Sequence, residues 1–444
     1  MMITAMIMLF AIGYLCIALE HKIKIDKAAT ALVLFGAIWT IYSIFSDSTT
    51  TGSELIEHLG STCETLVFLI GAMTIVDLID THGGFSIITD HITSRNKLTL
   101  VWLLALITFF MSAVLDNMTT TIIMIMMLRR IIPEARDRWI FAGVIIIAAN
   151  SGGAWSPIGD VTTIMLWMRG NVTAPSLVAY LILPCIISTI IPILIASRIL
   201  RRGERMLPNT TIATQLPDGI GQRFSRAVLL TGVGGLLFVP IFKSITGLPP
   251  YVGMMLSLGA VWMVTEWAYG RKRNIEEEVK NRVSKVLKNI DMSTILFFLG
   301  ILMSVAGLQS AGILGRAANF LDSNIHEVFS ITSVVGVLSS IIDNVPLVAA
   351  CMGMYPIADS STVTAAADPS YAAMFLPDGL FWLLLTYCAG VGGSILIIGS
   401  AAGVVAMGLE KIDFMWYLKN ISLMAFAGYV AGIVTIYLES LILL

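Results

Sequence analysis

The chain has 444 residues, of which 57% are hydrophobic and only 13% are charged, and its formal net charge is −2. Soluble domains carry about a quarter charged residues, so this composition excludes an ordinary water-soluble protein. The near-neutral charge gives no indication of a nucleic-acid partner. Apolar stretches of roughly 18 residues or more recur along the whole length, which predicts an all-α polytopic membrane protein in the lipid bilayer.

The predicted membrane spans begin at the N-terminus. Residues 2–19 have neither a basic n-region nor a small-residue cleavage site, so we expect the first span here and not a removable signal. About ten full spans are predicted from hydropathy, at 2–19, 27–46, 64–80, 139–168, 177–199, 226–243, 251–269, 293–312, 379–409 and 415–438.

Two further apolar segments, 98–133 and 328–360, are assigned by the positive-inside rule. If each returns to the side on which it begins, as a re-entrant hairpin, almost all Lys and Arg lie in the cytoplasm. If 98–133 crossed once, the basic loops 201–205 and 271–274 would face outside. We therefore expect two hairpins, a plasma (inner) membrane location and both termini outside the cytoplasm. The basic residues that this layout leaves outside are Arg169, Lys243 and Arg316.

Each hairpin carries an Asp-Asn pair in the middle of its apolar sequence. The first, SAVLDNMTTT, has Asp116 and Asn117, and the second, SSIIDNVPLVAA, repeats the pair as Asp343 and Asn344 at an offset of 227. Asp116 could serve only as a helix N-cap. However, ionisable residues at this depth are costly and mark functional sites, and the recurrence favours function. Three hydroxyls follow the first pair, at Thr119, Thr120 and Thr121.

A glycine-rich break follows each hairpin. The segment NSGGAWSPIGDVTTIM (150–165) aligns with AGVGGSILIIGSAAGV, so that Gly152, Gly153 and Gly159 match glycines 240 residues later. Ahead of the hairpins, TLVFLIGAM (65–73) resembles TILFFLGILM (294–303). The glycines could serve packing alone, and Asp160 could be structural. Three landmarks in the same order nevertheless predict an internal repeat of ~100 residues.

The two repeats are predicted to be inverted, because the chain crosses the membrane an odd number of times between their starts. Inverted repeats with interrupted segments are typical of secondary transporters, whose site lies near the midplane. Each break leaves free carbonyl groups and a half-helix N-terminus, which are tolerated in a membrane only around a cavity. Together with the polar hairpin tips, these groups are predicted to form a site for a hard cation. The predicted organisation is N-terminal scaffold helices (1–63), a first repeat core (64–170), scaffold helices and cytoplasmic loops (171–292), a second repeat core (293–411) and a C-terminal helix (412–444).

These motifs resemble the NhaD-type sodium/proton antiporters of the ion transporter superfamily, which also holds arsenite permeases and sodium-coupled dicarboxylate and citrate transporters. The dicarboxylate relatives carry Ser-Asn-Thr at both hairpin tips, whereas Asp116 and Asp343 replace that Ser here. The replacement favours a site for cations alone. The resemblance implies a homodimer with a scaffold domain and a mobile transport domain that moves like an elevator.

The first repeat is the richer in oxygen ligands, so we expect the principal sodium site there, at Asp116, Asn117 and Asp160. Asp116 and Asp160 are the expected exchanging carboxylates, and Asp343 is a third participant. The further candidate ligands or helix-end partners are polar residues of the tips and breaks: Asn344, Thr119, Thr120, Asn150, Ser151, Thr162, Thr163, Ser394 and Ser400.

The expected activity is exchange of Na+, and also Li+, for H+ by alternating access. Desolvation raises the pKa of a carboxylate in a low-dielectric site, so protons and sodium compete for it. No cofactor is expected, and the P-loop motif of an ATPase is absent. An arsenite or dicarboxylate carrier would need a basic or thiol group at the midplane. An intramembrane hydrolase, the enzymatic alternative, would need a nucleophile with a base, and no histidine lies deep enough.

Overall fold

The computed structural model describes residues 2–18, 23–46, 48–85, 96–132, 134–201, 222–271, 283–341 and 343–443. Every regular element in these ranges is helical, as predicted. The long helices other than the hairpins and the broken helices are α1 (Met2–Ala18), α3 (Lys27–Phe45), α4 (Ser48–Thr81), α10 (Ala174–Arg201), α11 (Gln222–Thr246), α12 (Pro250–Arg271), α14 (Met292–Ser310) and α23 (Ser422–Leu443). Short helices are α13 (Val283–Val286), a 3-10 turn (Leu287–Asn289), α15 (Ile313–Asn324), α18 (Ser360–Ala365), α19 (Pro369–Ala373) and α22 (Phe414–Asn420).

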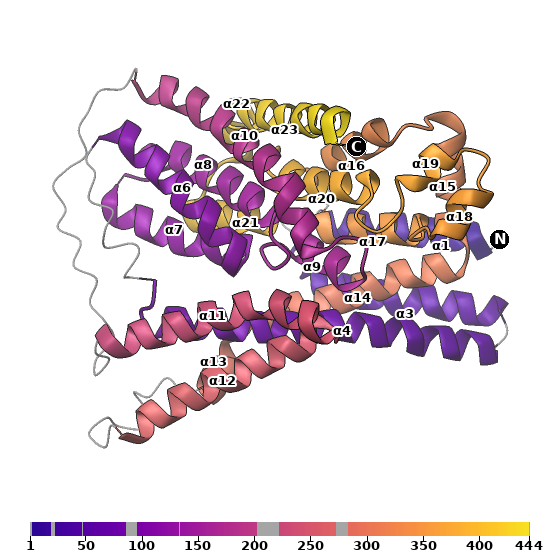
Figure 1. The fold of residues 1–444 in the computed structure, drawn as a ribbon, viewed down its shortest axis with the longest axis horizontal. Helices are drawn as coiled ribbons and strands as arrows, with labels where there is room; N and C mark the ends of the chain where they lie inside the picture. The colour runs from indigo at the N-terminus through magenta and orange to yellow at the C-terminus, as the bar shows by residue number, and fades with distance from the viewer. Residues whose placement is uncertain are drawn as a thin grey trace.

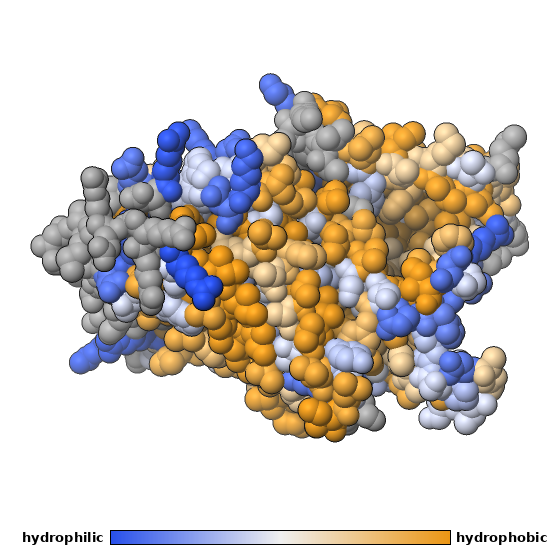
Figure 2. Space-filling model, turned by 90° about the horizontal axis from the view of Figure 1, so that it is seen from above, coloured by the Kyte–Doolittle hydropathy of each residue, from blue (hydrophilic) through white to orange (hydrophobic). Residues whose placement is uncertain are grey.

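The helices have the lengths and surface of a membrane protein. In the described ranges, seven are long and apolar enough to cross a bilayer: α3, α4, α6 (Lys97–Leu115), α10, α11, α14 and α23. Figure 2 shows hydrophobic residues over much of the middle of one face and hydrophilic residues gathered toward its two ends. The chain is therefore an all-helical, multi-span membrane protein.

Two predicted boundaries differ from the structure. The segment 47–63, which separates the predicted spans 27–46 and 64–80, is helical from Ser48 onward and lengthens α4 to 34 residues. Hydropathy detects apolar sequence and not helix, and this polar stretch contains no proline to end one. The predicted span 415–438 is divided at Ile421, which separates the short helix α22, capped by Asp413, from the long apolar helix α23.

The first repeat core is a helical hairpin followed by a broken helix. Helices α6 (Lys97–Leu115) and α7 (Asn117–Ile131) meet at Asp116. Helix α8 (Ala135–Ala154) is separated from α9 (Val161–Met168) by a non-helical break. Helix α6 packs along α8. A Cβ at Gly152 would collide with the backbone carbonyl of Phe109, so the helices approach this closely only because the residue is glycine.

The second core repeats these contacts. Helices α16 (Val328–Ser339) and α17 (Asn344–Met354) form the hairpin, and α20 (Leu380–Gly392) and α21 (Ala401–Glu410) the broken helix. The Ser112 Oγ donates to the carbonyl of Ala149 over 2.6 Å, and the Ser339 Oγ donates to that of Ala389 over 2.8 Å. A Cβ at Gly392 would meet the carbonyl of Gly336. The same glycine and serine contacts thus hold hairpin to broken helix in both cores.

The other long helices surround the two cores. In Figure 1, α3, α4, α11 and α12 form the lower layer and most of the core helices the upper one, with α14 between them. Helix α14 packs against α3 and α4, and α10 packs against α23. The hairpin α6–α7 lies at the left of the view, whereas α15, α18 and α19 lie at the right. The two cores interlock, since α7 contacts α21 and α17 contacts α9.

Candidate cation and proton site

The tip of the first hairpin is a capped helix end with an unusual backbone. Asp116 has φ 105°, a region that favours glycine. Its Oδ1 accepts a hydrogen bond from the Thr119 amide and its Oδ2 one from the Thr119 hydroxyl, both over 2.8 Å. Both carboxylate oxygens thus form hydrogen bonds within the first turn of α7. The next residue, Asn117, is buried in the protein interior.

Asp160 lies at the centre of the site and is only 1% exposed. It caps α9, where its Oδ1 accepts from the Thr162 amide (2.9 Å) and hydroxyl (2.8 Å). The Nδ2 of Asn117 donates to its Oδ2 over 2.7 Å. The Nδ2 of Asn344, from the second hairpin, lies 3.4 and 3.5 Å from its two oxygens. Among the described residues, no Lys or Arg forms an ion pair with this carboxylate, so neutral donors and a helix N-terminus hold it.

Asn150 connects the two broken helices. Its side chain is fully buried, and its Oδ1 accepts from Asn117 over 3.0 Å. Its Nδ2 donates to the Ser394 and Ser400 hydroxyls, both over 2.9 Å. Ser400 in turn caps α21 through the Gly403 amide. A single amide thus links the charged break of the first core to the uncharged break of the second.

The structure brings seven of the thirteen predicted site residues into this network: Asn117, Asn150, Asp160, Thr162, Asn344, Ser394 and Ser400. The other six lie outside it. Asp116 and Thr119 bond each other, and Ser151 accepts from the Ser188 hydroxyl. The buried hydroxyls of Thr120 and Thr163 have no hydrogen-bond partner. Asp343 caps α17 and pairs with Lys27, at 3.6 Å.

A cavity of about 340 Å³ reaches Asp160 from one side of the molecule. Its mouth includes residues that the sequence did not single out for the site. Asp26 and Lys27 begin α3, and Asp291 and Ser293 begin α14. The sequence could have indicated these residues in one way. Each is a charged or hydroxyl residue at the start of an apolar run, and the predicted topology places both of these starts on the same side of the membrane. The cavity thus brings Asp160 into contact with the same space as the charged and hydroxyl residues at the starts of α3 and α14.

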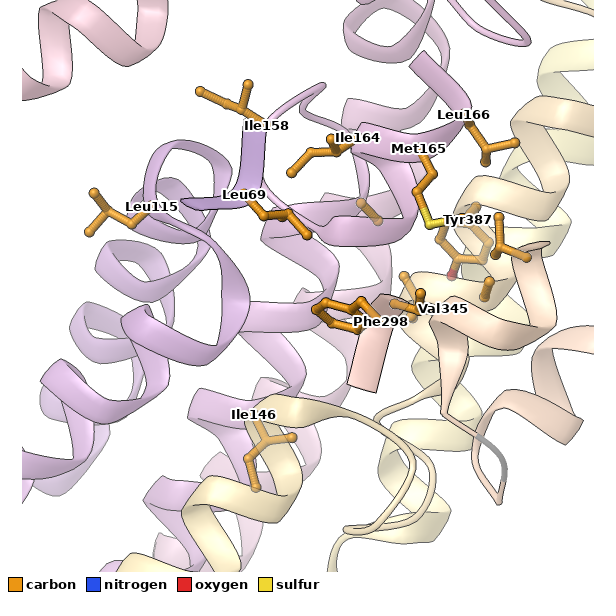
Figure 3. Packing of buried hydrophobic residues seen from close by; sticks show 14 of the residues in the cluster. Leu69, Leu115, Ile146, Ile158, Ile164, Met165, Leu166, Phe298, Val345 and Tyr387 are labelled. Carbon is orange, nitrogen blue, oxygen red and sulfur yellow. The ribbon is translucent and has the colours of Figure 1, made fainter. Parts of the chain in front are cut away.

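Hydrophobic packing holds the remaining sides of the site. Figure 3 shows Ile164 and Met165 of α9, Phe298 of α14 and Val345 of α17 in the same region of the core. Each of the four is largely or fully buried, and α17 contacts both α9 and α14. This apolar surrounding lowers the local dielectric around Asp160, and charge–charge interactions are stronger in such a place than in water.

Comparison with known proteins identifies the relatives. Residues 7–377 match the family described as citrate transporter (CitMHS). The chain is 44% identical to sodium/proton antiporter 1 of Arabidopsis thaliana (97% of this chain, 71% of that protein) and 45% identical to sodium/proton antiporter 2 (97% and 98%). It is 30% identical to the Na+/H+ antiporter NhaD of Vibrio cholerae, over 97% of this chain and 90% of that protein. The chain belongs to the NhaD-type antiporter family.

The fold resembles that of a solved transporter. The crystal structure of the Alcanivorax borkumensis YdaH transporter matches with a TM-score of 0.60 at 12% identity, over 94% of this chain and 98% of that one. At this identity the likeness concerns the fold alone. It agrees with the helical, multi-span architecture described above.

Proposed function

We propose that this protein exchanges Na+ for H+ across a membrane and that Asp160 is the carboxylate at which the two ions compete. Sodium/proton antiport follows from 44–45% identity to two sodium/proton antiporters over 97% of the chain. The observation that supports the role of Asp160 is its position. It is buried, held by neutral donors, and reached by a cavity.

The amide groups around Asp160 can serve both ions. Asn117 and Asn344 approach the carboxylate through their Nδ2 atoms, so their Oδ1 atoms point elsewhere. Rotation of either amide presents its oxygen to a cation beside Asp160, and oxygen ligands are those that hard cations prefer. When a proton replaces sodium, the protonated carboxyl of Asp160 can donate a hydrogen bond to one amide oxygen. The other amide then donates to the carboxyl through its Nδ2. Na+ and H+ therefore exclude each other at one carboxylate.

The architecture of the exchange is also part of the proposal. The two cores form an inverted repeat, supported by matching contacts at Ser112 and Ser339 and by caps at Asp116 and Asp343. Helices α6–α7 and α16–α17 are re-entrant hairpins that move with the broken helices against a scaffold of α3, α4, α11, α12 and α14. Both termini lie outside the cytoplasm, the protein is a homodimer in the plasma membrane, and Li+ substitutes for Na+.

Reconstitution into liposomes with a trapped pH dye tests the function. Adding Na+ or Li+ should move protons in the opposite direction, whereas K+ should have little effect. Citrate is the necessary comparison, because the matching family is described as citrate transporter. Sodium-dependent uptake of citrate without proton counter-movement would contradict antiport.

A further inference from the structure

The two hairpin tips differ in how their carboxylates are satisfied. At the first tip both oxygens of Asp116 are occupied by the amide and hydroxyl of Thr119. The residue that corresponds to Thr119 at the offset of 227 is Pro346. Proline has no N–H and no hydroxyl, so Asp343 cannot make this cap. It accepts instead from the Val345 amide over 3.3 Å through Oδ1 alone.

Lys27 forms an ion pair with the other carboxylate oxygen of Asp343, Oδ2. Its Nζ lies 3.6 Å from Oδ2 of Asp343. The same Nζ lies 4.4 Å from the ring centroid of Phe297 on α14, a cation–π contact. The start of α3 is also fixed to α14, since the Ser293 hydroxyl lies 3.0 and 2.9 Å from the Asp26 carboxylate oxygens. The ammonium group is therefore presented to the hairpin tip by the rigid α3–α14 pair.

The ion pair lies beside the cation site. Lys27, Asp343, Asn344 and Asp160 line the same cavity, and Lys27 is the basic residue among the described residues that line it. Asn344, which donates to Asp160, directly follows Asp343 in the chain. An ammonium group in this place occupies a carboxylate that would otherwise attract Na+ entering the cavity.

We propose that Lys27 is a built-in counter-cation that competes with Na+ for Asp343 and so sets the apparent sodium affinity on the cavity side. The proposal rests on sodium/proton exchange as the function. Sodium entering the cavity displaces the ammonium from Asp343 before or as it reaches Asp160. At the first hairpin, Thr119 engages Asp116 through neutral hydrogen bonds, which leave the negative charge of that carboxylate in place.

Lys27→Met tests the proposal, with the apparent KM for Na+ of reconstituted protein at fixed pH as the readout. The KM should fall by about two- to five-fold, the range expected of a partly exposed ion pair. Lys27→Arg should stay near wild type in KM, because it keeps the charge. Lys419→Met, which removes the same charge from an exposed position on α22, is the matched control and should leave KM unchanged. In an Asp343→Asn background, Lys27→Met should have no further effect.

A second variant keeps the test decisive if Lys27→Met folds poorly. Pro346→Thr supplies Asp343 with the hydroxyl and amide that Asp116 has, so it should weaken the pair and also lower the KM. An unchanged KM in both variants, or a Lys27→Met effect that persists in Asp343→Asn, would overturn the counter-cation role. Absence of sodium-driven proton movement in the wild type would instead overturn the proposed function.

Discussion

At the scale of single residues, the two breaks differ by one charge. Asp160 caps α9 and Ser400 caps α21 at equivalent places, 240 residues apart. Serine caps a helix about as well as aspartate, so capping does not require a carboxylate here. The charge must therefore be explained by what else Asp160 contacts, and those contacts are the two hairpin amides.

Asp160→Ser separates a cap from an exchange site. The variant keeps a cap for α9, so we expect a folded protein that has lost sodium-driven proton movement. In the wild type the apparent KM for Na+ should rise as pH falls, because protons compete for the same carboxylate. Proteoliposomes loaded with a pH dye, assayed over a range of pH, measure the sodium-driven proton movement and the apparent KM for Na+. The matched control is Asp413→Ser, which makes the same change at the exposed cap of α22 and should retain exchange. Normal exchange in Asp160→Ser would remove this residue from the site.

The sequence predicted the residues of the network better than their partners. Asn117, Asn150 and Asp160 were recognisable because a polar residue inside an apolar run is costly without a function. The sequence did not show that Asn344 would reach Asp160 across the two cores, since that depends on how the cores interlock. From the sequence, Lys27 is only a basic residue at the predicted cytoplasmic end of the span 27–46, because nothing local to it indicates the Asp343 carboxylate more than 300 residues away.

At the scale of helices, an ion cluster around one buried carboxylate joins the ends of the two cores. Glu410, the last residue of α21, has a fully buried side chain. Its Oε1 accepts from Arg129 of α7 over 2.6 Å, and its Oε2 from Arg138 of α8 over 2.7 Å. Arg129 also donates to the carbonyl of Leu409. Two guanidinium groups of the first core thus share one carboxylate of the second core as their counter-charge.

Glu410→Gln should destabilise the protein without changing its shape at this position. The amide is isosteric but neutral, so two guanidinium groups lose their counter-charge. Breaking a buried pair costs on the order of 3 kcal/mol, and the thermal midpoint of the purified protein in detergent should fall. The control is Glu134→Gln at the exposed start of α8, where the carboxylate makes no capping hydrogen bond. Equal midpoints for the two variants would show that the cluster contributes nothing.

The sequence located the two helix breaks and most helix starts, but not the start of α4. The breaks at 155–160 and 393–400 were predictable because glycines that permit close backbone contact also interrupt helices. The beginning of α4 at Ser48 was not, because its first turns are polar and their contacts are with distant residues: Glu54 accepts from Tyr42 of α3, and His58 hydrogen-bonds with Ser310 of α14. Hydropathy therefore predicts what lies in hydrocarbon and not where a helix ends.

At the scale of the whole molecule, polar cavities lie at both ends of α9. The cavity at Asp160 opens beside the starts of α3 and α14. A second cavity, of about 320 Å³, lies at the other end of α9, where Arg169 is surrounded by Glu57, Glu64 and His58. Arg169 donates to the Ser61 hydroxyl of α4 over 3.2 Å. Because Asp160 lines the cavity beside the α3 and α14 starts and does not line the other one, we expect the site to face the side of those helix starts.

The proposed topology makes that side cytoplasmic, and cysteine labelling can test it. The basic loops that indicated it, 201–205 and 271–274, lie largely outside the described residues, so exposed positions within the described ranges are better probes. In a background without the five native cysteines, Ser284→Cys before α14 should react with a membrane-impermeant maleimide only in inverted vesicles. Ala365→Cys in α18 should react only in intact cells.

Ser293→Cys, which lines the Asp160 cavity, should label from the same side as Ser284→Cys and be protected by Na+. Labelling of Ser284→Cys in intact cells would mean that residues 98–133 cross the membrane, and the inverted repeat would have to be abandoned with it.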